Sequence, residues 1–116
     1  MSMELNDVVK ESKKTWNHSP VERYADDDVE LIYLAGCLGG EVGELQNMIK
    51  KHFRGKYYSK GHPLQGDIKK FAGTEIADIL YYTSRLAELL NVDMEKEFRK
   101  KMEENTKRYN VPEAKM

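Results

Sequence analysis

Apolar residues recur at steps of three and four through the middle of the chain, the spacing that places side chains on one side of an α-helix. Between residues 29 and 53 this stripe consists of Leu31, Leu34, Ala35, Leu38, Val42, Leu45, Ile49 and Phe53. Between residues 67 and 90 a second stripe consists of Ile76, Ile79, Leu80, Thr83, Leu86, Ala87 and Leu90. The pattern therefore predicts two long amphipathic helices.

Two shorter helices are predicted toward the ends of the chain, over residues 3–16 and 93–109. Asp93 suits the N-cap of the last one, because its side chain can accept a hydrogen bond from a free backbone N–H. Residues 54–66 contain three glycines and one proline without periodicity, and they are predicted to form a loop. Residues 110–116 are predicted to be a frayed tail. Since no stretch alternates like a strand, the fold class is all-α.

Length and composition favour a single domain over residues 1–116. The net charge is −1 and lysines are interspersed with glutamates, so we expect neither nucleic acid nor a membrane as a partner. The single cysteine, Cys37, excludes an intramolecular disulfide and is expected to be a small buried residue. No apolar stretch is long enough to span a bilayer, and we expect a cytoplasmic protein.

Glycines mark the side of the 29–53 helix opposite its apolar stripe. They are Gly36, Gly40 and Gly43, with Gly39 nearby. Each glycine inside a helix costs about 1 kcal/mol relative to alanine. Close approach by another helix, from this subunit or a second one, would offset that cost. We therefore predict a homodimer or a dimer of dimers.

Two pairs of carboxylates, each three residues apart, carry the candidate chemistry. Glu41 and Glu44 lie on the first long helix, and Glu75 and Asp78 lie on the second. Residues at this spacing project from one side of a helix, about 60° apart. Two such pairs facing each other would form a four-carboxylate cluster. All-oxygen ligands suit Mg²⁺ first and Mn²⁺ second, and crowded carboxylates without a metal should raise one another's pKa.

A simpler interpretation stands beside this one. Considered by itself, the second helix places Asp78 on a side that also carries polar residues typical of a plain solvated face.

The histidines narrow the choice of metal, because His18, His52 and His62 all lack the Glu-x-x-His spacing of di-iron bundles. Iron and zinc are therefore disfavoured, and the simpler interpretation of all three histidines is that they are surface loop residues.

The last helix has a separate polar feature. Its apolar side consists of Met94, Phe98, Met102 and Tyr109. Asn105 lies in the middle of that side, with Lys101 and Arg108 on its flank. A buried amide needs hydrogen-bond partners. Asn105 either bonds a neighbouring backbone carbonyl or joins Lys101 and Arg108 in donating to a phosphate chain beside the carboxylates.

The order of these motifs resembles that of the MazG-like nucleoside triphosphate pyrophosphohydrolases, whose pattern is Glu-x-x-Glu, a variable connection and then Glu-x-x-Asp. The matching segments are Glu41-Val42-Gly43-Glu44, Glu75-Ile76-Ala77-Asp78, Asp78-Ile79-Leu80-Tyr81-Tyr82, Asn91-Val92-Asp93 and Lys101-x-x-x-Asn105-x-x-Arg108-Tyr109. The resemblance covers roughly residues 30–110. Their ordered succession is more specific than any single motif.

The resemblance implies a four-helix bundle, assembled through homo-oligomerisation, that splits a nucleoside triphosphate into monophosphate and pyrophosphate as nucleotide-pool house-cleaning. It implies that Mg²⁺ is bound by Glu41, Glu44, Glu75 and Asp78. The substrate-binding residues that it implies are Lys101, Asn105, Arg108, Tyr82, Tyr109 and Trp16. Among these, Lys101 and Asn105 correspond to phosphate contacts, and Trp16 resembles the aromatic residue that stacks on the base.

The chain departs from the family pattern at two positions, since Gly40 and Ala72 stand where a glutamate and a lysine often occur. We expect these two departures to affect the catalytic rate and the choice of substrate more than metal binding. Two alternatives stay open. One is a non-catalytic helical oligomerisation or interaction module. The other is a related all-α hydrolase, such as a dUTPase or a phosphoribosyl-ATP pyrophosphohydrolase.

Overall fold

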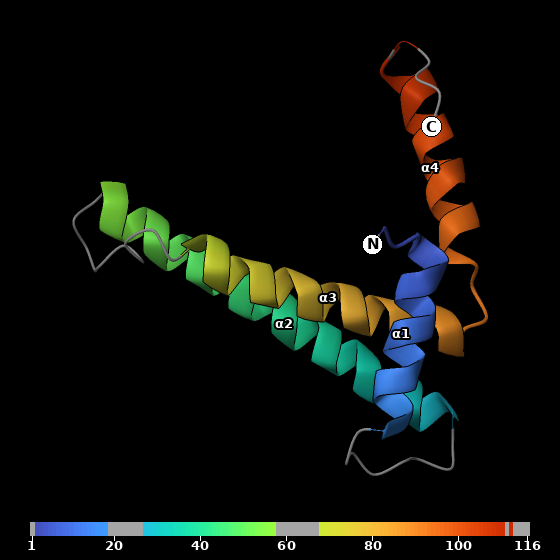
Figure 1. Ribbon diagram of the computed structural model, residues 1–116. Coiled ribbons are helices and arrows are strands. Elements are labelled where there is room, and N and C mark those ends of the chain that lie inside the picture. Colours follow the sequence, from blue (N-terminus) through green and yellow to red (C-terminus); the bar gives the residue numbers. More distant parts are fainter. Residues whose placement is uncertain (1, 19–26, 58–67, 111, 113–116) are drawn as a thin grey trace.

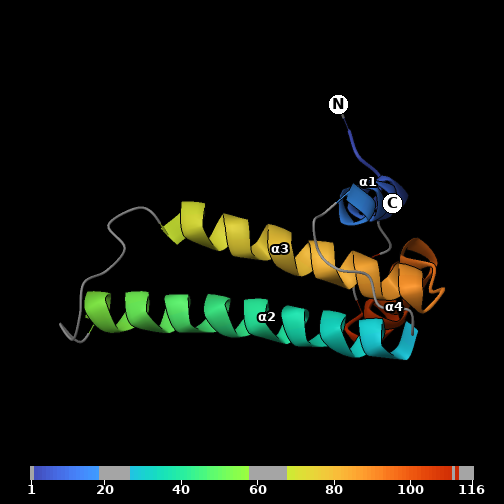
Figure 2. The ribbon, with the colours of Figure 1, turned by 90° about the horizontal axis from the view of Figure 1, so that it is seen from below.

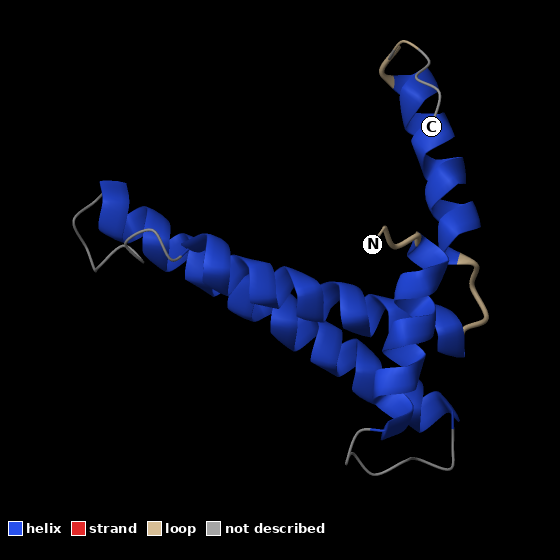
Figure 3. Ribbon diagram, in the orientation of Figure 1, coloured by secondary structure: helices blue, strands red, loops and turns tan. Residues whose placement is uncertain are grey.

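The computed structural model describes residues 2–18, 27–57, 68–110 and 112. These residues form α1 (Leu5–His18), α2 (Asp27–Tyr57), α3 (Ile68–Leu89) and α4 (Met94–Arg108). Within the described ranges there is no strand (Figure 3), which confirms the predicted all-α class. None of the four helices is both long enough and apolar enough to cross a membrane.

Helices α2 and α3 pack along each other as a long antiparallel pair (Figure 2). Helix α2 ends at Tyr57 rather than at residue 53, so the first four residues of the predicted loop are helical. Arg54 and Lys56 lie in the last turn, where positive charge favours a helix C-terminus, and the Phe53 and Tyr57 rings lie 4.7 Å apart one turn from each other. These contacts continue the helix past Gly55. The remainder of the predicted loop, 58–66, lies outside the described residues.

Helix α1 crosses the C-terminal half of α3 (Figure 1) and closes a small core there. Trp16, Leu34 and Ala87 are its buried apolar residues among those described. Ser12 and Ser84 are buried beside them, and each hydroxyl donates to the carbonyl oxygen four residues earlier, at 2.7 Å and 2.8 Å. Because these small polar groups are satisfied within their own helices, α1 and α3 can approach closely.

Helix α4 leaves the end of α3 and projects away from the α2–α3 pair, with its packing contacts on α1 (Figure 1). The connection turns at Asn91, whose φ of 56° lies in the left-handed region that asparagine tolerates. The Asp93 side chain accepts a hydrogen bond from the Lys96 backbone N–H at 3.1 Å. This confirms the predicted N-cap.

Much of the predicted apolar stripe is only partly covered in a single chain. The exposed fractions of Val42, Ile49 and Ile76 are 46%, 51% and 56%. On the far side of α2, a Cβ added to Gly36 or Gly43 would meet no atom within 4 Å. Within the described residues, therefore, no helix of the same chain makes the close approach that the glycines were expected to serve.

Candidate functional site

The antiparallel packing of α2 and α3 brings together three of the four predicted carboxylates. Glu41 reaches across from α2 to Glu75 and Asp78 on α3, and one oxygen from each lies within 4.8 Å of the others. Glu44 lies nearly one turn further along α2, is exposed and does not belong to this group of three. We call Glu41, Glu75 and Asp78 the acidic cluster. Its all-oxygen donors could hold a hard divalent cation.

Crowding in the acidic cluster changes the ionisation of Glu41. Its pKa rises from the ordinary value of 4.5 to about 7, first because Glu41 shares a hydrogen bond with Glu75, then through burial and the charges of Glu75, Glu44 and Asp78. The Oε2 atoms of Glu41 and Glu75 are buried and have no hydrogen-bond partner. Such atoms are costly to bury, and a bound cation would satisfy both.

Tyr82 borders the acidic cluster one turn after Asp78. Its pKa rises to about 12, chiefly through burial and then through the neighbouring Cys37, Glu41, Tyr33 and Asp78. The phenol therefore stays protonated at neutral pH and can donate a hydrogen bond beside the carboxylates. Of the residues predicted to bind substrate, Tyr82 is the one that the fold places at the cluster.

Trp16 occupies a core position in this chain. Its side chain is 5% exposed, and its Nε1–H donates to Glu30 at 2.9 Å. The indole lies 6.5 Å from the Tyr33 ring and meets the Tyr81 ring edge-on, also at 6.5 Å. In this arrangement Trp16 has no open face for a nucleotide base. Whether it stacks on a base when substrate binds stays a prediction.

Aromatic contacts that the sequence pattern did not predict link Trp16 to the acidic cluster. The Tyr81 ring touches Trp16 and stacks on Tyr82 with centroids 5.3 Å apart. On α2, Glu30, Tyr33 and Cys37 precede Glu41 at steps of three and four residues. That spacing, extended upstream from the carboxylate pair, is a signal that could have identified Tyr33 and Glu30.

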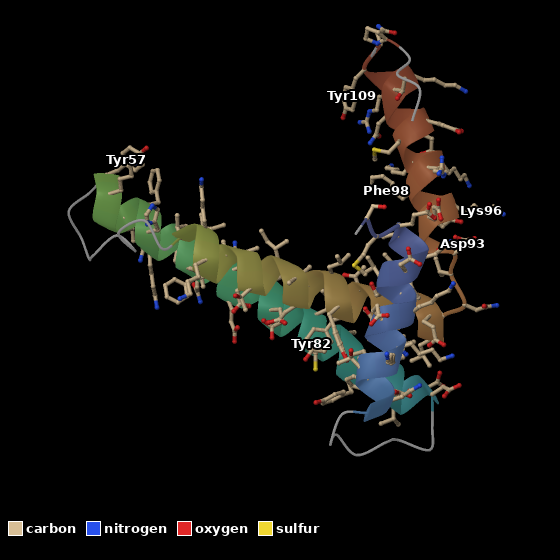
Figure 4. The ribbon with its side chains drawn as sticks, in the orientation of Figure 1. Tyr57, Tyr82, Asp93, Lys96, Phe98 and Tyr109 are labelled. Carbon is tan, nitrogen blue, oxygen red and sulfur yellow. The ribbon has the colours of Figure 1, made fainter. Side chains whose placement is uncertain are left out.

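The predicted phosphate contacts on α4 lie apart from the acidic cluster within one chain. Figure 4 shows Tyr109 near the far end of α4, whereas Tyr82 lies beside α2. Lys101 forms an exposed ion pair with Glu104 at 3.7 Å, and the Arg108 guanidinium lies over the Tyr109 ring at 5.5 Å. Lys101, Arg108 and Tyr109 are exposed, and Asn105 is half-buried.

His52 is half-buried within α2, so the surface-loop interpretation is wrong for this histidine. His62 and the side chain of His18 lie outside the described residues. Cys37 is half-buried rather than buried. Among the described residues, the group able to hold a metal consists of carboxylates alone.

The chain matches no protein-family model, no curated protein and no solved structure.

Proposed function

We propose that this protein is a Mg²⁺-dependent nucleoside triphosphate pyrophosphohydrolase of the MazG-like kind, releasing a nucleoside monophosphate and pyrophosphate. The observation that carries the proposal is the convergence of Glu41, Glu75 and Asp78, with two buried carboxylate oxygens that lack partners. The type of reaction is inferred from the resemblance of the ordered motifs to those of the MazG-like family. Mn²⁺ is the expected substitute metal.

The acidic cluster could perform the two roles that the hydrolysis requires, which are metal binding and proton transfer. A divalent cation held by the carboxylates would neutralise the non-bridging oxygens of the triphosphate, and a remaining carboxylate would accept the proton of the attacking water. The protonated Tyr82 hydroxyl lies beside these groups and would donate a hydrogen bond to a phosphate oxygen. These groups belong to one α2–α3 pair, so a single chain would supply this half of the proposed site.

The other half of the site requires a second copy of the chain. Lys101, Asn105 and Arg108 lie on α4, which points away from the acidic cluster of its own chain. A homodimer, alone or paired into a tetramer, would let α4 of one copy approach the α2–α3 pair of the other. Support comes from an apolar groove of about 870 Å³ between α3 and α4, lined by residues such as Leu80, Leu90 and Phe98.

A non-catalytic assembly module is the second candidate. The exposed apolar side chains and the open glycine side favour it, because both suit helix packing between copies and neither needs a substrate. In that case the acidic cluster would be a solvated face. The two candidates differ in one property, since an assembly module has no hydrolytic activity.

The test is a panel of nucleoside and deoxynucleoside triphosphates incubated with Mg²⁺, with products separated by anion-exchange chromatography. The proposal predicts monophosphate and pyrophosphate in equal amounts, without a diphosphate intermediate. The panel includes dUTP and phosphoribosyl-ATP, which distinguish the related hydrolases. Accumulation of nucleoside diphosphate and orthophosphate would show cleavage at the γ phosphorus, and inertness toward the panel would favour the assembly module.

A further inference from the structure

The far end of the α2–α3 pair has a charge unlike that of the rest of the molecule. Residues 45–57 and 68–74 carry six cations and no carboxylate; the cations are Lys50, Lys51, Arg54, Lys56, Lys69 and Lys70. We call these two ranges the basic tip. The residues between them include one lysine and one aspartate, whose formal charges cancel. In Figure 2 the last turns of α2 extend past the beginning of α3, so the tip projects from the molecule.

Interactions with the helix ends favour only some of these positive charges. Arg54 and Lys56 in the last turn of α2 are favourable, because positive charge stabilises a helix C-terminus. Lys69 and Lys70 occupy the first turn of α3, which contains no acidic residue, and positive charge there is unfavourable. None of the six cations forms an ion pair with another described residue. Their mutual repulsion is therefore uncompensated within the described chain.

Exposed aromatic rings lie among these cations. Phe53, Tyr57 and Phe71 are 47%, 62% and 43% exposed. Lys56 Nζ lies 5.5 Å from the centroid of the Tyr57 ring, and Figure 4 shows Tyr57 at the end of α2. Rings at a charged, projecting tip contribute little to the core of their own chain. Their flat faces suit stacking on nucleobases.

The combination of cations and exposed aromatic rings restricts the class of partner that the basic tip could bind. Inorganic phosphate or an acidic protein segment would engage the cations and leave the rings without a specific role. A single-stranded nucleic acid offers a phosphate for each cation and an unpaired base for each ring. The net charge of −1 hides this local asymmetry, because acidic residues elsewhere balance the tip.

We propose that the basic tip binds single-stranded nucleic acid, with Lys50, Lys51 and Arg54 on phosphates and Tyr57 stacked on a base. This binding differs from the expectation drawn from net charge. It does not depend on the proposed hydrolysis, since the acidic cluster takes no part in it.

The test is fluorescence anisotropy of a labelled oligothymidylate titrated with the full chain at several salt concentrations. Replacing Lys50, Lys51 and Arg54 by glutamine preserves helix propensity and removes three phosphate contacts. Single-strand affinity should fall, and the slope of log K against log salt should become shallower by about 2, at about 0.7 per contact. The matched control, with Lys10, Lys96 and Lys100 replaced by glutamine, has the same net charge and should bind like the parent.

A second variant separates the rings from the charges. Tyr57→Ala should weaken binding roughly tenfold and leave the salt slope unchanged, because stacking releases no counterions. Equal weakening by the tip and control triples would overturn the proposal, as would a parent that binds duplex as tightly as single strand. Absence of oligothymidylate binding by the parent would also overturn it, and a changed oligomeric state in the tip triple would then assign the tip to contact between copies.

Discussion

Two arms of this molecule, the α2–α3 pair (the first arm) and helix α4 (the second arm), carry the residues that are predicted to form one site. The arms differ in whether a single chain brings their residues together. In the α2–α3 pair, Glu41, Glu75 and Asp78 converge within a single chain. On α4, the predicted phosphate contacts share one helix but lie away from the acidic cluster. Spacing along a helix decides which side chains share a side. Where that side points depends on the turn before the helix and on what packs against it.

Removing a proposed metal ligand from the first arm should have the largest effect on activity. Asp78→Asn and Glu41→Gln preserve volume and each remove the charge of a proposed metal ligand, so activity should fall at least about a hundredfold, while far-ultraviolet circular dichroism stays close to that of the parent. Pyrophosphate release is the measurement. Glu103→Gln, an exposed position on α4, is the matched control and should retain activity.

Trp16→Ala tests whether the residues between α1 and the first arm form a stabilising core. Because the indole is 5% exposed and hydrogen-bonded to Glu30, its removal should cost about 3–5 kcal/mol in the free energy of unfolding, measured by urea denaturation. Met3→Ala, at an exposed residue, should change it by less than about 0.5 kcal/mol. Weaker substrate binding by Trp16→Ala at unchanged stability would show that the base-stacking role outweighs the core role.

Much of the fold follows from the sequence, because the apolar stripes of α2 and α3 have helical spacing over many turns. The acidic cluster follows in part, since two regular helices packed antiparallel bring Glu41 opposite Glu75 and Asp78, but the predicted fourth member, Glu44, lies outside the group. The direction of α4 does not follow. It depends on a short turn through Asn91 and on surfaces that a single chain leaves open.

The second arm is tested by Asn105→Ala, which should lower turnover by roughly 1–3 kcal/mol in transition-state free energy, the scale of one lost donor. If α4 acts on another copy, mixing inactive Asp78→Asn with Asn105→Ala should give more activity than the two proteins measured separately. Light scattering should detect a dimer or tetramer at micromolar concentration. A monomer, or mixed activity equal to the sum of the two, would contradict a site shared between copies.

A smaller effect is expected from pH in metal-free protein. The folded pKa of Glu41 is about 7, above its ordinary 4.5, so the folded state binds this proton more tightly than the unfolded chain. The resulting stability is fully present below pH 4.5 and is lost as pH rises to about 7. Glu88, whose pKa is lowered mainly by its hydrogen bond with Lys13, acts in the opposite direction and below pH 4.5. Thermal melting in chelator should follow this trend, and Glu41→Gln should flatten it.

Mg²⁺-dependent melting is the sharpest test of whether the acidic cluster binds metal, because a ligand that binds only the folded state raises the melting temperature by an amount that grows with the logarithm of its concentration divided by its dissociation constant. Mg²⁺ should raise the melting temperature of the parent and of Glu103→Gln, and it should have little effect on Glu41→Gln, Glu75→Gln or Asp78→Asn. Glu44→Gln, outside the group of three, should keep part of the shift. An equal shift in the parent and in all the cluster variants would contradict the assignment of the metal to the acidic cluster.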